Sequence, residues 1–402
     1  MLDVAITSPS LAVEDNVSGI SNLTRLVILT SKNVSFRHVV IGRKDTKKRN
    51  FFWILNQVKV LIIFFRRIRT VKLVHLNIPL EKFSILINVV LVLICWIMRK
   101  KIIVHFRGGA LSLHEDHSLL QRFCVRRFLK NASAVLVLGE KEKNYFKRKY
   151  RESINSKLYV LPNAVLIPDF DEIQVADKFS QSVIHFVYVG RIDLSKGLLE
   201  IVEALALCSN KFDYHFDIIG DGPDMEYFES VLRSSIGPRY THHGTKSIDQ
   251  IYSILGDCQI FLLPSHFEGL PNSLLEAMAN CVVPIVTPVG SIPEVVSVNN
   301  GFLVEVNNYQ MLEKAICKAV NDRSGLHEKS LAGRELMVKD YSIDTYCKKL
   351  FDLQLIKLVS VLLLLSKSFS IYTTKLSVDN YRYFGLLTSH FELVYFTAHK
   401  MG

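Results

Sequence analysis

Residues 258–296 read CQIFLLPSHFEGLPNSLLEAMANCVVPIVTPVGSIPEVV, and this stretch gives the strongest indication of the fold. The run CQIFLLP, Cys258 to Pro264, is short and almost continuously apolar, which is typical of a strand buried in a parallel sheet. A polar loop follows, and Pro271 then predicts the start of a helix, because proline fits the first helical turn, where its missing N–H has no partner to lose. The loop is therefore expected at the carboxyl edge of an open α/β sheet, where such sheets bind ligands.

The start of this helix is suited to a phosphate group. Backbone amides in the first turn of a helix have no helical partner, and they favour a negative charge at that end of the helix. Here they belong to Leu270, Asn272, Ser273 and Leu274. The sequence therefore predicts a diphosphate at this edge.

Two glutamates flank the junction, Glu268 on the loop and Glu276 more than one turn into the helix. From that geometry Glu268 lies above the phosphates, while the Glu276 carboxylate can accept both hydroxyls of a ribose. The alternative for two isolated glutamates is that Glu268 is a loop carboxylate and Glu276 a solvated helix residue.

An earlier stretch, VGRIDLSKG at residues 189–197, has the chemistry that a departing phosphate needs. Gly190 directly follows the strand-like run IHFVYV and Gly197 opens the amphipathic run GLLEIVEALALC, which predicts a tight strand-to-helix turn. In that turn, Arg191 and Lys196 can neutralise the negative charge that grows on the phosphate. Alone, either cation would be interpreted as an ordinary surface residue.

A third stretch, IIGDGPD at residues 218–224, repeats the turn with Gly220 and Gly222. In this order and spacing, the three stretches resemble the retaining glycosyltransferases of family 4, also called group 1. The resemblance covers residues 186–320 well and the first half of the chain loosely. It implies the GT-B fold, in which two Rossmann-like parallel-sheet domains face a central cleft, and it implies a nucleoside-diphosphate sugar as donor.

The resemblance also implies a role for each candidate residue. Glu276 matches the ribose ligand, and Glu268 matches the residue near the donor sugar and its reacting carbon. Arg191 and Lys196 match the basic pair that holds the donor diphosphate. UDP is the expected carrier because it is the commonest among relatives, with GDP and ADP left open, and neither a cofactor nor a metal is expected. The remaining positions expected to bind the donor are Gly190, Gly220, Gly222, Gly269, Leu270, Asn272 and, in the first half, Gly19.

In the first half, two positions match the family loosely. Gly19 precedes the helix-like run SNLTRLVI and matches the loop that faces the donor phosphates, where relatives often carry two or three glycines. His105, in IIVHFRGG, resembles the family's catalytic cleft histidine, and Arg107, Gly108 and Gly109 turn the chain away from it. The alternative for His105 is a hydrogen-bonded histidine at the end of a strand.

The length of the chain and the alternation of its apolar runs indicate the number of domains and the fold class. With 402 residues, 49% hydrophobic and 22% charged, the chain is long enough for two globular domains. Apolar runs alternate with helical patterns, which predicts an α/β fold with parallel sheets. We predict an acceptor-side domain at 1–165, a nucleotide-sugar-binding domain at 166–340, and a closing helix with an atypical apolar tail at 341–402. The strand-like runs are LDVAIT, HVVIG, KLVHL, KIIVHF and SAVLVLG, then IHFVYV, FDIIG, QIFLLP, VVPIVT and GFLVEV.

The positive charge of the chain belongs to its first part. Residues 1–170 contain 29 Lys and Arg against 11 Asp and Glu, a net charge of +18, whereas residues 171–402 carry a net charge of −7. Two apolar runs lie among these cations, VKVLIIFFRRIRTVK at 58–72 and FSILINVVLVLICWIMRKK at 83–101. We predict that the first lies on an anionic membrane surface, and that the second either lies there with Trp96 at headgroup level or forms a buried helix. Nucleic acid is not an expected partner, because no nucleic-acid-binding motif accompanies the charge.

Cysteine usage indicates the compartment. The seven cysteines lie mostly in apolar runs and never form CxxC, which predicts a reducing, cytoplasmic environment and no metal framework. The N-terminus does not resemble a cleavable signal peptide. HEDH at residues 114–117 is the nearest approach to a metal-binding spacing, with a solvated turn as the alternative.

These features predict an enzyme, a retaining glycosyltransferase of the hexosyltransferase type. It is expected to move a sugar to a glycan or glycolipid acceptor, a lipid-linked oligosaccharide, in cell-surface polysaccharide or lipopolysaccharide biosynthesis, as a peripheral protein on the inner face of the cytoplasmic membrane. The alternatives are a sugar-nucleotide epimerase of the same fold and a non-catalytic subunit that binds sugar nucleotide or membrane. The tail LQLIKLVSVLLLLSKSFSIY at 353–372 is an anchor, a peripheral helix or a segment without a role.

Overall fold

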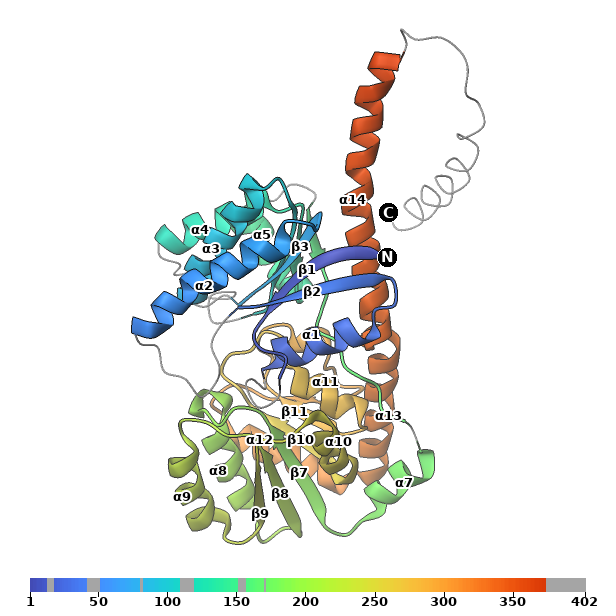
Figure 1. The fold of residues 1–402 in the computed structure, drawn as a ribbon. Coiled ribbons are helices and arrows are strands. Elements are labelled where there is room, and N and C mark those ends of the chain that lie inside the picture. The colour runs from blue at the N-terminus through green and yellow to red at the C-terminus, as the bar shows by residue number, and fades with distance from the viewer. Residues whose placement is uncertain are drawn as a thin grey trace. The chain divides into compact units, whose positions relative to one another are not determined.

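The computed structural model describes residues 1–12, 18–41, 51–79, 82–108, 119–150, 157–169 and 171–373, without the side chains of 51–57, 82–84 and 359–373. Met1–Lys357 form one compact unit. Within this unit lie two six-stranded sheets whose strand pairs are all parallel, with helices packed against them (Figure 1). The predicted α/β fold is confirmed. Gly109 and the HEDH stretch lie outside the described residues.

The first sheet has the strand order β2-β1-β3-β4-β5-β6. Its central strand β3 is buried along its whole length, with the apolar Val74, Leu76 and Ile78 on one face and the polar His75 and Asn77 on the other. The strands are β1 (Leu2–Ser8), β2 (Val34–Val40), β3 (Leu73–Ile78), β4 (Lys101–Phe106), β5 (Ala134–Val137) and β6 (Leu158–Val160). The helices between them are α1 (Gly19–Thr30), α2 (Phe51–Ile68), α3 (Lys82–Ile97), α4 (Leu119–Asn131) and α5 (Glu140–Lys149).

The second sheet has the order β12-β11-β10-β7-β8-β9, so β7 and β10 lie side by side at its centre. Its strands are β7 (Ile184–Val189), β8 (Tyr214–Ile219), β9 (Tyr240–Gly244), β10 (Ile260–Leu263), β11 (Val283–Val286) and β12 (Phe302–Leu303). The helical segments are α7 (Glu172–Ser180), η1 (Leu194–Lys196), α8 (Leu198–Cys208), α9 (Met225–Ile236), α10 (Ile248–Asp257), α11 (Asn272–Ala279), η2 (Ile292–Glu294), α12 (Tyr309–Asn321), α13 (Arg323–Asp340) and α14 (Ile343–Thr373).

The sequence patterns locate most of these elements. The run IHFVYV is β7 with the same bounds, whereas the polar strand β9 has no counterpart among the predicted strands. Pro271 lies one residue before α11, as the residue that caps it, rather than inside its first turn. Each sheet has its own apolar core, around Phe106 and Phe128 in the first and around Phe186 and Phe261 in the second.

The chain crosses from the first sheet to the second between β6 and α7. There Val165 donates its amide to the Tyr341 carbonyl at 2.9 Å and accepts the Ile343 amide at 2.9 Å, so the outgoing chain and the start of α14 pair with each other. The predicted division between residues 165 and 166 lies in this segment and stays a prediction.

The two apolar runs of the first half form α2 and α3, and each buries one face. Phe64 and Ile68 of α2 are fully buried in the first core, as are Leu91 and Cys95 of α3. The buried-helix alternative for the second run thus holds for one face of α3. No helix in the described part of the chain is both long and apolar enough to cross a membrane.

The close approach of two loops at Gly220 provides a stability test. Gly220 has φ +134°, and a Cβ there would lie 1.8 Å from the Gly190 carbonyl oxygen, whereas Gly237 has φ +61° with open space around it. Gly237→Ala should cost about 1–3 kcal/mol from backbone strain alone, and Gly220→Ala should cost more because the β7 loop must also move. Urea unfolding midpoints of the two variants measure the difference. An equal loss of stability in the two variants would show that the two loops can move apart at no cost in free energy.

Candidate functional site

The carboxyl ends of β7, β8 and β10 carry the three predicted stretches on adjacent loops (Figure 1). After β7, the chain passes through η1 and enters α8 at Gly197. After β10, it runs from Pro264 to Pro271 and enters α11. The His266 amide donates to the Ser195 carbonyl at 2.9 Å and joins these two loops. Parallel strands thus bring residues about 70 positions apart to one edge.

The central contact of this edge is an ion pair. The Lys196 ammonium donates to Glu268 Oε1 at 2.8 Å, and the buried Ser265 hydroxyl donates to the same oxygen at 3.0 Å. Thr287 in turn donates its hydroxyl to the Ser265 carbonyl at 2.5 Å. The side chains of Lys196 and Glu268 are 26% and 13% exposed, so the pair is partly shielded from water and still reachable. The structure therefore brings these two predicted residues together.

Arg191 lies on the same loop and is exposed. Its carbonyl accepts the Tyr188 hydroxyl at 2.6 Å, which fixes the backbone. Among the described residues, none forms a hydrogen bond or ion pair with its guanidinium. The loop therefore presents a fixed Cα and a free planar cation, the type of group that binds phosphate oxygens in pairs.

Glu276 is a buried carboxylate rather than a solvated helix residue. It lies in α11 with 8% of its surface exposed, and no hydrogen bond or ion pair joins its carboxylate to another described residue. Burial raises the pKa of Glu276 to about 7, because nothing compensates the loss of water around the charged form. A buried acceptor without a donor is suited to hydroxyl groups of a ligand.

Two helix starts meet beside these residues. The amides of Asn272, Ser273 and Leu274 donate to no backbone carbonyl of the described residues, so they are available to an anion. The Asn272 side-chain amide donates to the Gly19 carbonyl at 3.0 Å, and Gly19 begins α1. The predicted first-half position Gly19 therefore lies against the predicted second-half position Asn272.

The loop of Gly269 and Leu270 also touches the first half. A Cβ on Gly269 would lie 3.1 Å from the Cα of Gly108, which follows β4, so the two backbones pass in close contact. The Asn163 side chain donates to the Leu270 carbonyl at 2.8 Å. The candidate donor loop is therefore held from both halves of the chain.

Comparison with known proteins identifies the family of one segment of the chain. Residues 169–335 match the family model described as glycosyl transferases group 1. This part of the chain belongs to that family. The matching segment includes all of the candidate positions except Gly19 and His105.

Curated relatives are between 26% and 29% identical to this chain over the parts that align. An uncharacterized glycosyltransferase of Methanocaldococcus jannaschii is 26% identical over 221 residues, 53% of this chain and 58% of that protein. The GPI3 subunit of phosphatidylinositol N-acetylglucosaminyltransferase from Saccharomyces cerevisiae is 29% identical over 42% of this chain and 40% of its own length. A capsular polysaccharide biosynthesis glycosyltransferase of Staphylococcus aureus is 29% identical over 34% of this chain and 37% of its own. The matches thus span less than two thirds of each of these proteins.

Solved structures share the fold over nearly the whole chain. A sucrose-phosphate synthase of Thermosynechococcus elongatus superposes with a TM-score of 0.72 at 15% identity, covering 90% of this chain and all of that one. Anabaena HepE, solved with UDP and glucose, gives a TM-score of 0.69 at 15% identity over 88% and 99% of the two chains. The GT-B fold expected for a chain with a group 1 domain is confirmed.

His105 needs a correction. It is fully buried, its ring stacks on that of His75 with centroids 5.6 Å apart, and its Nε2 lies 3.2 Å from the Leu161 carbonyl oxygen. Burial, with Arg107 nearby, holds the pKa of His105 well below its ordinary value, so the ring is neutral. His105 lies on the face of β4 opposite Val104 and Phe106, beside His75. The structure therefore supports the alternative, a buried histidine at the end of a strand within hydrogen-bond distance of a backbone carbonyl.

Arg107, two residues after His105, is linked to the group 1 domain through hydrogen bonds. Its guanidinium donates to Asn77 at 2.7 Å, to Asn163 at 3.0 Å and to the Tyr346 hydroxyl at 3.0 Å. Because Asn163 also donates to the Leu270 carbonyl, Arg107 positions the donor loop of the group 1 domain through one intermediate side chain. From the sequence, Arg107 is expected only to be part of a turn.

Glu294 makes a second contact that no local sequence pattern predicts. Its carboxylate accepts the backbone amides of Glu140 at 2.8 Å and Lys141 at 3.0 Å, the first residues of α5. A carboxylate at a helix N-terminus satisfies otherwise unpaired donors and interacts favourably with the helix dipole. A group 1 residue thus caps a first-half helix.

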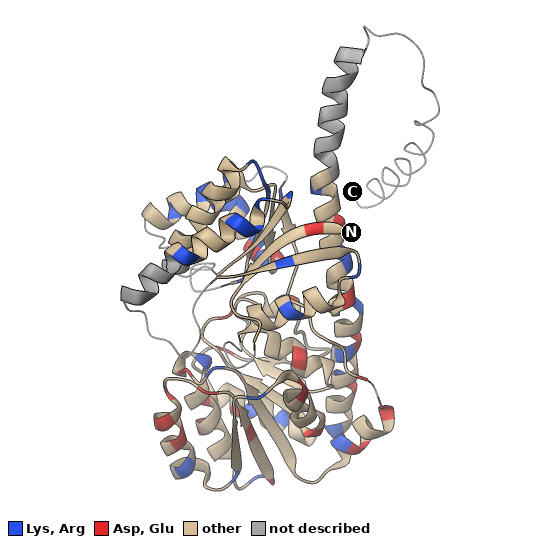
Figure 2. Cartoon of the chain, in the orientation of Figure 1, with Lys and Arg blue, Asp and Glu red and all other residues tan. Residues whose placement is uncertain are grey.

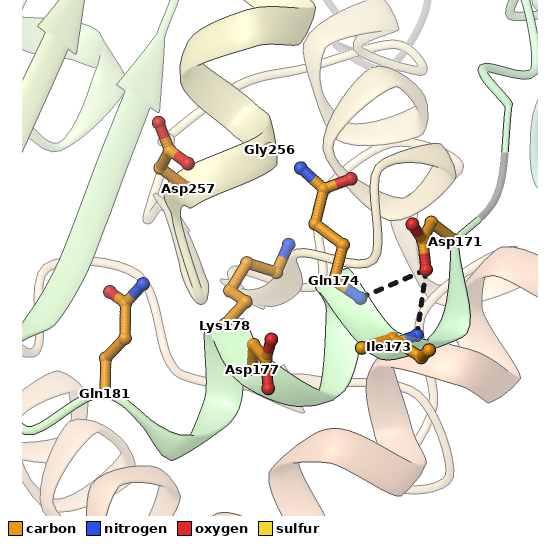
Figure 3. Close-up of a pocket in the computed structure, with 8 residues that line it drawn as sticks. All are labelled: Asp171, Ile173, Gln174, Asp177, Lys178, Gln181, Gly256 and Asp257. Carbon is orange, nitrogen blue, oxygen red and sulfur yellow. Dashed lines mark hydrogen bonds between the residues drawn. The ribbon is translucent and has the colours of Figure 1, made fainter.

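A cavity of about 280 Å³ lies elsewhere in the group 1 domain, between α7 and the end of α10 (Figure 3). Among its lining residues, Lys178 donates to the Asn280 carbonyl at 2.9 Å, and burial lowers its pKa to about 8. Gln181 and Asp257 of the lining precede β7 and β10, so this cavity faces the amino ends of the strands. The candidate donor residues lie at the opposite edge, and the cavity is not their site.

The buried Glu276 generates a pH-dependent prediction. Because its folded pKa of about 7 exceeds the ordinary value of 4.5, this carboxyl makes the folded protein less stable as pH rises between these values. Glu276→Gln should therefore match the parent near the lower value and be more stable by about 2–3 kcal/mol at about pH 8 without ligand. Thermal unfolding across pH measures this, with Glu328→Gln, an exposed carboxylate of α13, as the control. A parallel pH profile for Glu276→Gln and its parent would contradict the burial argument.

Proposed function

We propose that the chain is a retaining glycosyltransferase that transfers a hexose-type sugar from a nucleoside-diphosphate sugar, with UDP as the first choice of carrier. The acceptor is a lipid-linked glycan of cell-surface polysaccharide or lipopolysaccharide biosynthesis. The named relatives in capsular polysaccharide and phosphatidylinositol glycosylation support this class of acceptor, and the UDP complex of HepE supports the carrier.

One observation carries the proposal. Lys196 and Arg191 lie on the loop after β7, which contacts the loop after β10. The latter loop leads into α11, whose first amides and whose buried Glu276 carboxylate have no hydrogen-bond partner among the described residues. Cations and amides suit a diphosphate, while a buried carboxylate without a donor suits the two hydroxyls of a ribose. A single nucleoside diphosphate satisfies all of them at once.

The chemistry follows from the charges. The bond between the anomeric carbon and the diphosphate oxygen breaks while the acceptor hydroxyl attacks the same face of the sugar. Negative charge grows on the departing diphosphate, and Arg191, Lys196 and the α11 amides stabilise it. The acceptor proton passes to that diphosphate, which is then the nearest strong base. Lys196 exchanges its partner Glu268 for the diphosphate during this step.

The turnover rates of variants that lack Arg191 or Lys196 test the proposed glycosyl transfer. Arg191→Ala and Lys196→Ala should each depress turnover at saturating donor about a hundredfold, the scale of losing one preorganised charge stabiliser. Arg233→Ala removes a cation from the exposed face of α9 and serves as the matched control. Product analysis with a donor panel, with and without acceptor, accompanies the rates.

The outcomes separate the candidate functions. Near-parental rates for both variants would place the phosphate site elsewhere. An epimerised sugar nucleotide formed without acceptor would replace the transferase by an epimerase. The absence of both products, with nucleotide binding intact, would leave a non-catalytic binding subunit.

We also propose that the acceptor-side half docks on an anionic membrane on the cytoplasmic face. The outer face of α2 exposes large apolar side chains between cations: Ile62 is 50% exposed and Phe65 46%, followed by the exposed Arg66, Arg67 and Arg69. Figure 2 shows Lys and Arg on α2 and its neighbours, whereas Asp and Glu gather on the helices of the second sheet. Apolar side chains flanked by arginines suit the headgroup region of a bilayer. On α3 and α4, Trp96 and Leu119 are also well exposed, at 62% and 84%.

Vesicle binding tests the membrane proposal. Changing Arg66, Arg67 and Arg69 to Glu should release the protein from anionic vesicles, because each cation near the surface contributes about 1 kcal/mol, and raised salt should do the same to the parent. The matched control changes three exposed cations of α5, Lys141, Lys147 and Arg148, where no large apolar side chain is exposed. Cosedimentation with vesicles measures both. Binding that ignores salt and both triple changes would point to residues 353–372 instead.

A further inference from the structure

A group of metal-ligating side chains lies between two helices of the second half. Cys208 is the last residue of α8, and Glu313 and Cys317 lie one turn apart on α12. Their Sγ, carboxylate oxygen and Sγ atoms all lie within 4.8 Å of one another. The Cys317 thiol donates to Glu313 Oε1 at 3.0 Å. Residues more than 100 positions apart in the sequence thus present three ligand atoms to one point.

The ligand set suits a thiophilic divalent cation. Two sulfurs and one carboxylate oxygen are ligand types that Zn²⁺ takes at four-coordinate sites, and the i, i+4 spacing on α12 places two of them on one face. Cys208 is buried, whereas Glu313 and Cys317 are only partly buried. Two of the three ligand side chains are therefore reachable from solvent.

A cationic side chain already lies at this point. The Lys211 ammonium is 2.5 Å from Glu313 Oε1 and 3.9 Å from Cys317 Sγ. Its side chain is 49% exposed, so it can withdraw into water. Two thiolates and a carboxylate carry three negative charges, which attract a divalent cation more strongly than the single charge of the ammonium.

We propose that Cys208, Glu313 and Cys317 form a binding site for a thiophilic divalent cation of the Zn²⁺ type, and that Lys211 competes with the metal for it. The bound cation clamps the end of α8 to α12, and α8 begins at the loop that carries Lys196. Binding stabilises the folded protein by mass action. Thiols ligate such a cation as thiolates, so binding displaces thiol protons.

The test uses the purified full-length protein in reductant that does not chelate metal. Titration with Zn²⁺ by calorimetry, and with Cd²⁺ by thiolate charge-transfer absorption, should give one site per chain and a rise in unfolding temperature. Cys317→Ser and Glu313→Gln should each weaken binding at least about tenfold, the lower bound for altering even a supporting residue of a metal site. Cys347→Ser, which removes another partly buried thiol in α14, should bind as the parent does.

Lys211→Met gives the most specific result. It removes the competing ammonium while keeping a long side chain, so the metal should bind more tightly than to the parent. Tighter binding to this variant together with weaker binding to Glu313→Gln supports the site, and nucleotide binding by each variant verifies the fold. Three results would each overturn the proposed site. They are the absence of stoichiometric metal binding by the parent, an equal loss of metal affinity in Cys347→Ser, and weaker metal binding to Lys211→Met.

Discussion

The Lys196–Glu268 ion pair is the interaction on which the candidate site depends. It joins the loop after β7 to the loop after β10, and Ser265 also donates to the glutamate and holds it in place. A partly shielded ion pair costs desolvation, which its geometry and the added hydrogen bond offset. The ion pair contributes less to the stability of the fold than to the geometry of the site, because it keeps a cation and an anion at fixed places beside the proposed diphosphate.

Around this pair, both halves of the chain meet through polar contacts at the ends of elements. Asn272 bonds the start of α1, Asn163 bonds the Leu270 carbonyl, and Glu294 caps α5. Hydrogen bonds of this kind contribute little net free energy each, because water replaces them when they open. They therefore set the register of the two halves at a small gain in free energy.

Glu276, like the Lys196–Glu268 pair, does not serve to stabilise the fold. A buried carboxyl with no hydrogen-bond donor among the described residues makes the unliganded protein less stable as pH rises from its ordinary pKa of 4.5 to its raised pKa of about 7. A ligand that supplies hydroxyl donors removes that cost on binding. The proposed cation between α8 and α12 acts in the opposite direction, by stabilising the domain at the far end of the helix that follows Lys196.

Local sequence is enough to predict the parallel sheets, because buried strands such as β7 and β10 must be apolar on both faces and the loops after them carry unusual glycines and prolines. It also indicates Arg191, Lys196, Glu268 and Glu276, since those residues stand near a strand end or in the helix that follows it.

Contacts between distant parts of the chain follow from tertiary packing alone. The polar edge strand β9 forms by pairing with β8, His105 is buried beside His75, and Glu294 meets a helix that begins 154 residues earlier. Cys208, Glu313 and Cys317 converge for the same reason. Local periodicity dictates which face of an element is buried, whereas the packing of whole elements determines which side chains meet.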